Sequence, residues 1–236
     1  MTNNLMEMPV QQATDRTPPP GLRDRKKAHR RAQILRHAAR LFGQNGIDAT
    51  TMAELAEATQ VSPPTLFNYF GTKDGILIAM IAEGSHQFRE TDTAMHPRTD
   101  ADFGTILVEM LGQVTTRTLE IAGKRVWRYA EASVIRHPDT ELSREYSTIN
   151  DQLIGAVATF MGQYDLRLRC GDDPDPAQLG RLVFDVWNAA FLDLIRTEDM
   201  TLEAHRQTLQ ARIAPLARQL FEDGFLAAPA LKHRSP

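Results

Sequence analysis

The feature that most constrains this chain is a pair of short helical segments joined by a tight break, between residues 50 and 73. Thr50 and Thr51 are suitable N-caps for the first segment, in which Met52, Leu55 and Ala56 share one face. A break at residues 59–61 separates the two segments, and a longer helical pattern over 24–44 precedes them. Three helices in this arrangement, the last two joined by a tight turn, predict a helix-turn-helix unit.

The second segment has the features of a recognition helix. It begins with Ser62 as N-cap and with two prolines in the first turn, where proline is tolerated. Leu66 and Phe70, four residues apart, are expected to face a core with Leu55 and Phe42. The opposite face would then carry Pro63, Pro64, Thr65 and Asn68 outward. An asparagine can pair with adenine through two hydrogen bonds, and Thr65 and Pro64 can contact thymine methyl groups.

Charge is distributed unevenly along the chain. The net charge is −3 overall, but residues 1–73 carry +4 and the remaining residues carry −7. A basic end on an acidic body suits a protein that approaches a polyanion with one end only. The run from Arg23 to Arg31 concentrates this positive charge, and we interpret it as an arm that follows the DNA backbone or enters an adjacent minor groove. The alternative is the solvated start of a helix.

The rest of the chain reads as helical. Residues 1–22 are polar, end in Pro18-Pro19-Pro20-Gly21 and show no period, which predicts a disordered arm. Beyond residue 72, helical patterns cover about 73–93, 101–121, 124–136, 140–164, 176–197 and 201–222, with no convincing strand. The predicted fold is all-α, with a three-helix helix-turn-helix head over 23–72, a six-helix body over 73–225 and a flexible tail over 226–236.

The head resembles the DNA-binding domain of the TetR family of repressors. The resemblance rests on Ala49 to Asp74, together with Ile34-Leu35, Ala38-Ala39, Leu41-Phe42 and Gly46 upstream. It implies phosphate contacts at Thr51, Tyr69 and Lys73, although Thr51 can equally be a helix cap. Two positions depart from the family pattern. Gln60 replaces a glycine, so the turn can place a non-glycine residue at positive φ. Phe67 replaces a tyrosine, which removes one phosphate hydrogen bond and leaves packing as an alternative role.

These arguments give one set of predicted DNA-binding residues: Arg25, Lys26, Lys27, Arg30, Thr51, Ser62, Pro63, Pro64, Thr65, Phe67, Asn68, Tyr69 and Lys73.

The resemblance also implies that the body binds a small effector and forms a homodimer. Large apolar and polar side chains mixed along the central helices are expected to build the core, and some of them to line an effector pocket. The candidate pocket residues are Met80, Phe88, Phe103, Met110, Trp127, Glu131, Tyr146, Phe160, Phe184 and Trp187. The last two helices are expected to pair across a twofold axis, unless both faces pack inside one subunit. The candidate interface residues are Leu182, Val186, Ala190, Phe191, Leu194, Leu209, Ile213, Leu216 and Leu220.

Catalytic motifs are missing from the sequence. It has no glycine-rich phosphate loop, no His-Glu-x-x-His helix and no Gly-x-Ser-x-Gly elbow, so we expect no catalytic residues, no metal site and no cofactor. The single cysteine, Cys170, excludes an internal disulfide, and the lack of a long apolar run excludes a membrane span. A cytoplasmic setting fits both observations.

The sequence therefore predicts a regulator that binds a pseudo-palindromic double-stranded DNA operator as a homodimer. Repression is expected, with release by a small apolar or amphipathic effector. The alternatives are an effector-independent activator or architectural factor and, more remotely, a helical enzyme. The operator, the effector, the regulated genes and the sign of regulation are not encoded in any motif.

Overall fold

The computed structural model describes residues 21–91 and 95–232. In these residues the chain forms ten helices, and its only β-pairings are two isolated bridges. The predicted all-α fold is therefore confirmed. Of the predicted arm over residues 1–22, only residues 21 and 22 are described. The first helix begins at Leu22. None of the helices in the described ranges combines the length and the apolar character that a bilayer span requires.

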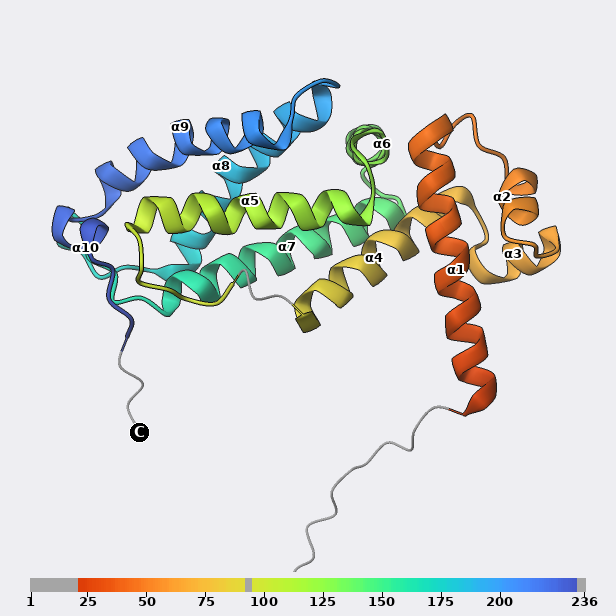
Figure 1. Cartoon of the computed structure of the whole chain (residues 1–236), viewed down its shortest axis with the longest axis horizontal. Coiled ribbons are helices and arrows are strands. Elements are labelled where there is room, and N and C mark those ends of the chain that lie inside the picture. The colour runs from red at the N-terminus through yellow and green to blue at the C-terminus, as the bar shows by residue number, and fades with distance from the viewer. Residues whose placement is uncertain (1–20, 92–94, 233–236) are drawn as a thin grey trace, which may run out of the picture.

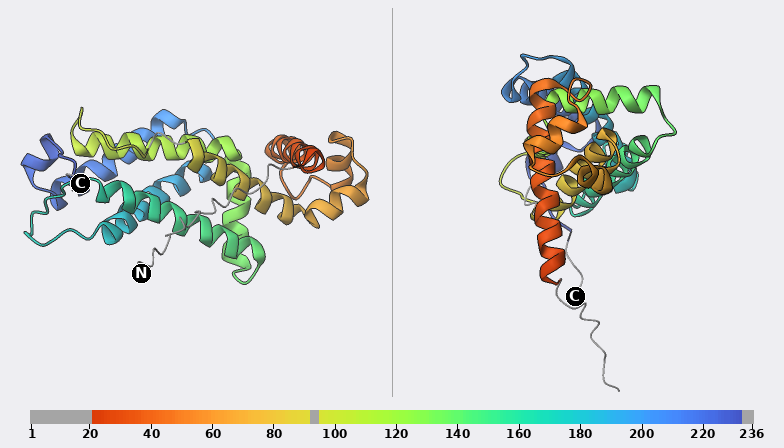
Figure 2. Two further views of the ribbon diagram at one scale, coloured as in Figure 1. Left: turned by 90° about the horizontal axis from the view of Figure 1, so that it is seen from below. Right: turned by 90° about the vertical axis from the view of Figure 1, so that its right-hand side faces the viewer.

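The molecule is elongated, with a small head at one end. Helices α1 to α3 form the head, α4 leads from the head into the body, and α5 to α9 form the body (Figure 1). Helices α5, α7 and α9 run along the long axis, whereas α6 stands across it (Figures 1 and 2). The bounds are α1 Leu22–Asn45, α2 Met52–Ala58, α3 Pro63–Phe70, α4 Lys73–Thr91, α5 Phe103–Ile121, α6 Lys124–Arg136, α7 Glu141–Gly162, α8 Pro176–Arg196, α9 Leu202–Leu220 and α10 Asp223–Ala227.

The head is held together by a compact apolar core. Ile34 and Phe42 of α1, Leu55 of α2 and Leu66 of α3 are all fully buried. Gly46 ends α1 with a φ of 88°, a left-handed value that glycine adopts without a steric penalty. Because α3 has only eight residues, it depends on this packing, since isolated helices of that length are not stable in water.

The body depends on close packing between helices that are distant in sequence. Helix α7 packs along α8, and α5 packs along α9. Where α8 crosses α7, Gly180 is buried against Ala158. A Cβ atom at residue 180 would lie 2.7 Å from the Ala158 Cα. The absence of a side chain at Gly180 therefore lets the two helix backbones touch.

The end of the body opposite the head is closed by the C-terminal residues. The Asp165 N–H donates to the Ala230 carbonyl at 2.8 Å, and the Lys232 N–H donates to the Gln163 carbonyl at 2.8 Å. The prediction of a flexible tail over 226–236 is therefore wrong for residues 226–232, and residues 233–236 lie outside the described part. The short apolar stretch here has too few residues to show a helical period, so the sequence did not reveal its packing.

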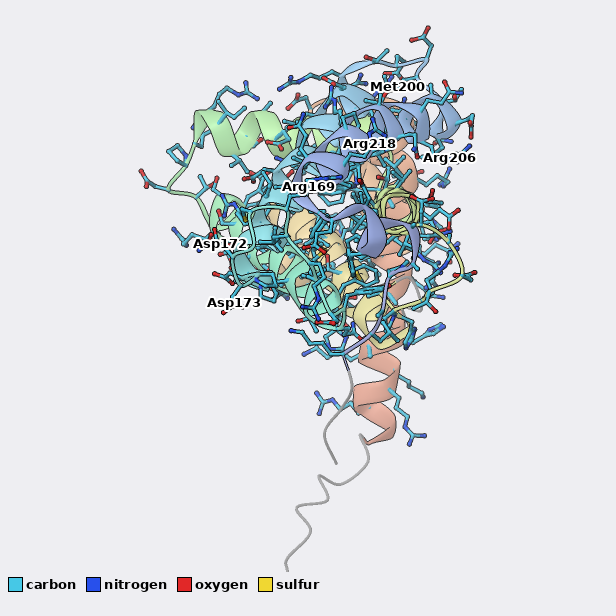
Figure 3. The ribbon with its side chains drawn as sticks, turned by 90° about the vertical axis from the view of Figure 1, so that its left-hand side faces the viewer. Arg169, Asp172, Asp173, Met200, Arg206 and Arg218 are labelled. Atoms are coloured by element: carbon cyan, nitrogen blue, oxygen red, sulfur yellow. The ribbon has the colours of Figure 1, made fainter. Side chains whose placement is uncertain are left out.

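An arginine strengthens the same closure. Arg169 follows α7, and its Nε donates to the Arg218 carbonyl at the end of α9 at 2.7 Å. Its guanidinium also pairs with Asp223, in the first turn of α10. Figure 3 shows Arg169 and Arg218 together on this end of the molecule, with Asp172 and Asp173 in the loop that leads to α8. Helix α10 was not predicted, because five residues carry no readable period.

The contact between α7 and α8 gives a prediction on stability. Gly180→Ala should lower the free energy of unfolding by about 1–3 kcal/mol, because the new methyl group overpacks the contact with Ala158. Gly155→Ala is the matched control. Gly155 lies inside α7, and an added Cβ there would meet nothing within 4 Å. This control should gain about 0.5–1 kcal/mol from better helix propensity. Urea unfolding of both variants checks the prediction, and equal changes would contradict it.

Candidate nucleic-acid interface and interior cavity

Local hydrogen bonds shape the start of α2 and the turn between α2 and α3. Thr51 and Glu54 form a reciprocal capping box: the Thr51 hydroxyl accepts from the Glu54 N–H at 3.1 Å, and the Glu54 carboxylate accepts from the Thr51 N–H at 2.7 Å. The hydrogen bonds from Thr51 lower the pKa of Glu54. The Val61 N–H donates to the Ala56 carbonyl at 3.0 Å. Gln60 has a φ of 53°, which confirms the positive φ predicted for this non-glycine residue.

Helix α3 turns an uncharged surface to solvent. Pro63, Pro64 and Asn68 are exposed, and Phe67 retains 51% of its accessible surface, whereas Leu66 is fully buried. No charged side chain occurs anywhere in α3. Any reading of bases by this helix must therefore use the Asn68 amide and apolar contacts, because these are the groups that the exposed face offers.

The start of α3 uses its own hydroxyl groups as caps. Ser62 accepts from the Thr65 N–H at 3.3 Å, and the two hydroxyl oxygens lie 2.8 Å apart. Ser62 is exposed and Thr65 is half-buried. Both predicted DNA-binding residues therefore have a structural role that fixes the first turn of the helix.

The residues predicted to hold phosphates also have structural partners. Thr51 is exposed, but its hydroxyl is engaged with Glu54. Tyr69 is half-buried beside Phe70. The Lys73 ammonium donates to the carbonyls of Ile47 at 2.7 Å and Asp48 at 3.2 Å, which ties the start of α4 to the loop between α1 and α2. An ammonium has three donors, so one remains for a phosphate.

The basic run lies on a helix rather than on an extended arm. Arg25, Lys26, Lys27 and Arg30 are all exposed on α1. An α-helix with side chains is about 10–12 Å wide, whereas the minor groove is about 6 Å wide. The helical backbone of the run from Arg23 to Arg31 is therefore too wide to enter a minor groove as an extended arm would. Both contacts of its side chains, with the DNA backbone or with a minor groove, stay predictions.

Helix α6 contacts the end of α1 in the head and the start of α4, the helix that leads out of the head. The Arg125 guanidinium donates to the Gln44 carbonyl at the end of α1 at 2.7 Å. One turn later, the Tyr129 hydroxyl donates to the Asp74 carboxylate at the start of α4 at 3.0 Å. Burial, followed by the charge of Asp74, raises the pKa of Tyr129. Neither contact could be predicted from the sequence, because each joins residues far apart in the chain and leaves no periodic signal.

An ion pair between Arg31 and Glu83 also joins α1 to α4. The Arg31 guanidinium pairs with Glu83 and lies 4.8 Å from the centroid of the Phe70 ring. Cation–π contacts of this kind contribute about 0.5–1 kcal/mol at partly exposed sites. One arginine of the basic run therefore stabilises the head internally, which removes it from the set available to DNA.

A cavity of about 270 Å³ that is partly open to solvent, the interior cavity, lies among the helices of the body. Aromatic side chains from α6, α7 and α8 form part of its wall, and the Trp187 and Phe191 rings are stacked at 5.2 Å between centroids. The apolar lining residues are Met95, Val114, Ile121, Trp127, Tyr146, Ile149, Leu153, Ala156, Trp187 and Phe191. The polar lining residues are Ser85, Arg117, Thr118, Asn150, Gln152 and Asn188.

Comparison with known proteins decides the family. Residues 34–80, which include α2, α3 and the connecting turn, match the model of the bacterial regulatory proteins of the tetR family. The chain belongs to the TetR family. It is therefore a helix-turn-helix transcriptional regulator.

Two curated relatives and one solved structure illustrate the relationship. The TetR-family chain is 28% identical over 211 residues to the regulator TcmR of Streptomyces glaucescens, covering 86% of this chain and 90% of that protein. It is 41% identical over 59 residues to the repressor ComR of Escherichia coli K12, covering 25% of this chain and 28% of that protein. A TetR-family regulator from Mesorhizobium loti shares the fold, with a TM-score of 0.63 at 14% identity, covering 84% of this chain and 99% of that one.

The structure places the predicted pocket residues of this TetR-family protein in several different environments. Trp127, Tyr146 and Trp187 line the interior cavity. Met110 and Phe160 instead line a separate groove of about 500 Å³ that also touches α9. Glu131 lies behind the cavity wall, where it accepts a hydrogen bond from the Tyr146 hydroxyl at 3.0 Å. Met80, Phe103 and Phe184 are core residues outside both spaces, and the Phe88 side chain lies outside the described residues.

Most of the predicted dimer residues lie inside the subunit. Ala190, Phe191, Leu194, Leu209 and Ile213 retain at most 2% of their accessible surface in a single chain. They have no surface left for a partner, so their assignment to an interface is wrong. The physical reason is that the main apolar face of α8 and that of α9 pack inside one subunit, the alternative that the sequence left open. Leu182, with 37% exposed, and the half-buried Val186, Leu216 and Leu220 remain accessible.

A buried hydrogen-bond network lies between the cavity and α9. The Trp187 indole N–H donates to the Thr115 hydroxyl at 2.9 Å, and the Thr115 oxygen lies 2.8 Å from His205 Nε2. His205 is 1% exposed, and its Nδ1 has no hydrogen-bond partner in the described residues. Burial lowers the pKa of His205 from 6.5 to about 4, outweighing the Ala190 carbonyl, which acts in the opposite direction.

The exposed basic residues of α1 generate a prediction on DNA affinity. Replacing Lys26, Lys27 and Arg30 with glutamine should weaken binding to all DNA sequences alike. It should also flatten the dependence of log affinity on log salt by about one unit per lost phosphate contact. Fluorescence anisotropy at several salt concentrations measures both quantities. Arg136→Gln with Arg144→Gln, both exposed on the body, is the control and should leave the slope unchanged. A loss confined to one DNA sequence would contradict the assignment.

The buried histidine generates a prediction on pH dependence. Below pH 6.5 the unfolded chain takes up a proton at residue 205, whereas the folded chain resists it until about pH 4. The free energy of unfolding should therefore fall by about 2 kcal/mol at this residue between pH 7 and pH 5. His205→Gln keeps a hydrogen-bonding group but does not titrate. Urea unfolding at both pH values should show a smaller loss in this variant than in the wild type, and parallel losses would refute the prediction.

Proposed function

We propose that this TetR-family regulator represses transcription as a homodimer and releases its operator when a small effector fills the interior cavity. Residues 23–72 form the DNA-binding unit, and residues 73–225 form the unit that binds the effector and the partner subunit. The observation that carries the proposal is the exposed face of α3, because a sequence-reading helix must present side chains that no other part of the protein covers.

Recognition of DNA combines specific and general contacts. Asn68 reads adenine through its amide, while Pro64 and Phe67, three residues apart on the same face, contact thymine methyl groups. Phosphates are bound by Thr51, Tyr69 and the free donor of Lys73, and by the basic residues of α1. The positive charge of these residues draws the head to DNA before the bases are read.

Twofold pairing follows from the shortness of a half-site. One α3 helix contacts only a few base pairs, so two heads are needed for a specific operator. The accessible apolar residues Leu182 and Val186 on α8, with Leu216 and Leu220 on α9, support pairing through these two helices. The match of the head to a curated repressor supports repression as the sign of regulation.

Helix α6 provides the physical link between the cavity and the head. Arg125 and Tyr129 are four residues apart and contact α1 and the start of α4, whereas Trp127 points about 200° around the helix from Arg125 and lines the cavity. An effector that displaces Trp127 therefore moves the helix that holds α1 and α4. The effect on DNA affinity equals the difference in effector affinity between the two head positions.

An effector-independent factor is the competing function. Such a protein needs no space in its body, so the cavity beside α6 argues against it. An effector-independent factor would bind its operator with an affinity that no small compound changes.

Selection of bound sequences from a random DNA pool tests the proposal. The wild-type protein should select a motif with two inverted half-sites, and Asn68→Ala should lose preference at one base pair per half-site, at a cost of about 1–3 kcal/mol. Ile135→Ala, a control at an exposed residue of α6 far from α3, should select the wild-type motif. A motif without twofold symmetry contradicts the dimer, and an unchanged preference in Asn68→Ala contradicts the adenine contact.

A further inference from the structure

The polar groups of three aromatic residues in the interior cavity form hydrogen bonds within the protein. The Trp127 indole N–H donates to the Thr118 carbonyl at 2.9 Å, and the Trp187 indole N–H donates to Thr115. The Tyr146 hydroxyl donates to Glu131, whose charge adds to burial in raising the pKa of this phenol and keeps it neutral. These three side chains therefore offer a ligand their ring surfaces and no hydrogen-bond donor.

The one charged residue among the described lining residues is compensated. Arg117 donates to the Glu120 carboxylate at 3.1 Å, across one turn of α5. A charged ligand would have to compete with this pair and would lose its hydration in an aromatic cavity. Burial of an uncompensated charge is costly, so the cavity selects against strongly charged compounds.

Two amides of the wall are available to bind a ligand. Asn150 on α7 and Asn188 on α8 line the cavity, are half-buried, and have no side-chain hydrogen bond among the described residues. Asn150 follows Tyr146 by one helical turn, and Asn188 lies beside Trp187. Each amide supplies both a donor and an acceptor. A ligand with hydroxyl and carbonyl oxygens on its edge therefore satisfies groups that an aliphatic chain leaves unpaired.

We infer that the cavity takes an uncharged, flat aromatic compound with hydroxyl and carbonyl oxygens, whose rings lie against Trp127 and Trp187 and whose oxygens bind Asn150 and Asn188. The volume of about 270 Å³ lies just below the range of about 300–1,000 Å³ typical of pockets for drug-sized ligands, so the compound has few rings. This inference deepens the proposed function, because it names the chemistry of the effector.

The chain contains its own reporter for this inference. Its two tryptophans both line the cavity. Quenching of the intrinsic emission of the full-length protein therefore measures occupancy at this site. A hydroxyflavone should quench it saturably. Fluorene, which has rings but no oxygen, decanol, which has oxygen but no rings, and naphthoate, which is charged, should each bind at least about tenfold more weakly.

Variants separate the two parts of the inference. Asn150→Ala and Asn188→Ala should each weaken hydroxyflavone about tenfold, the effect of one lost hydrogen bond, and should leave the affinity for fluorene unchanged. Thr148→Ala is the matched control, since Thr148 is exposed on the same helix as Asn150. Because the two asparagines are only half-buried, thermal unfolding should show both variants folded, and binding of fluorene verifies that the cavity persists.

Three results would overturn the inference. Absence of quenching by hydroxyflavone rejects the aromatic ligand. An affinity for decanol equal to that for hydroxyflavone rejects the role of the rings. An equal loss of affinity for fluorene and for hydroxyflavone in the asparagine variants rejects the role of the amides. Operator binding is measured in parallel. Binding of hydroxyflavone in the cavity without any change in operator affinity supports this inference while contradicting the release mechanism, so the two failures are distinguishable.

Discussion

The DNA-facing surface of this protein depends on the burial of Leu66. Helix α3 is too short to persist in water by itself, and burial of one leucine side chain contributes about 1.5–3 kcal/mol. The burial of Leu66 in the core that also contains Phe42 and Leu55 therefore both forms the helix and fixes its rotation. Asn68 and Phe67 face outward because Leu66 faces inward. In the proposed function, the reading of bases is thus a consequence of a hydrophobic contact that touches no nucleotide.

The position of the head relative to the body depends in turn on contacts made by α6. This helix has one face with Arg125 and Tyr129 against the head and another with Trp127 against the cavity. Neither hydrogen bond to the head is strong by itself, since each contributes on the order of 1 kcal/mol. Together they give α6 a defined position relative to α1 and α4. A modest energy difference between two positions is sufficient for regulation, because a factor of ten in affinity requires only about 1.4 kcal/mol.

The sequence predicted the head in more detail than the body, for a physical reason. Contacts in the head are local, so the spacing of Leu55, Ser62 and Leu66 and the chemistry of the turn specify its helices, down to the positive φ of Gln60. Contacts in the body join distant segments. An apolar residue such as Phe191 looks the same in a sequence whether it lines a cavity, fills a core or meets a partner, and only the packing distinguishes these roles.

The polar contacts of the site could not be predicted from the sequence either. Lys73 was identified by its position in the motif, but its hydrogen bonds to the Ile47 and Asp48 carbonyls depend on the path of the loop after α1. The spacing of Tyr146 and Asn150 was the one available signal for a polar anchor beside an aromatic wall. Without the position of α8, the sequence does not show whether Asn150 lines a cavity or is exposed on the surface.

The far end of the body has a consequence for the order of events during synthesis. Tyr164 is fully buried, packs on Phe103, donates its hydroxyl to the Arg98 carbonyl and pairs with Leu231. These partners come from nearly the whole length of the body, and Leu231 is synthesised after all the others. The buried apolar residues of α1 to α3, in contrast, all come before residue 71, so they can begin to pack while the chain is still growing. A nascent chain therefore presents its helix-turn-helix before the body can close.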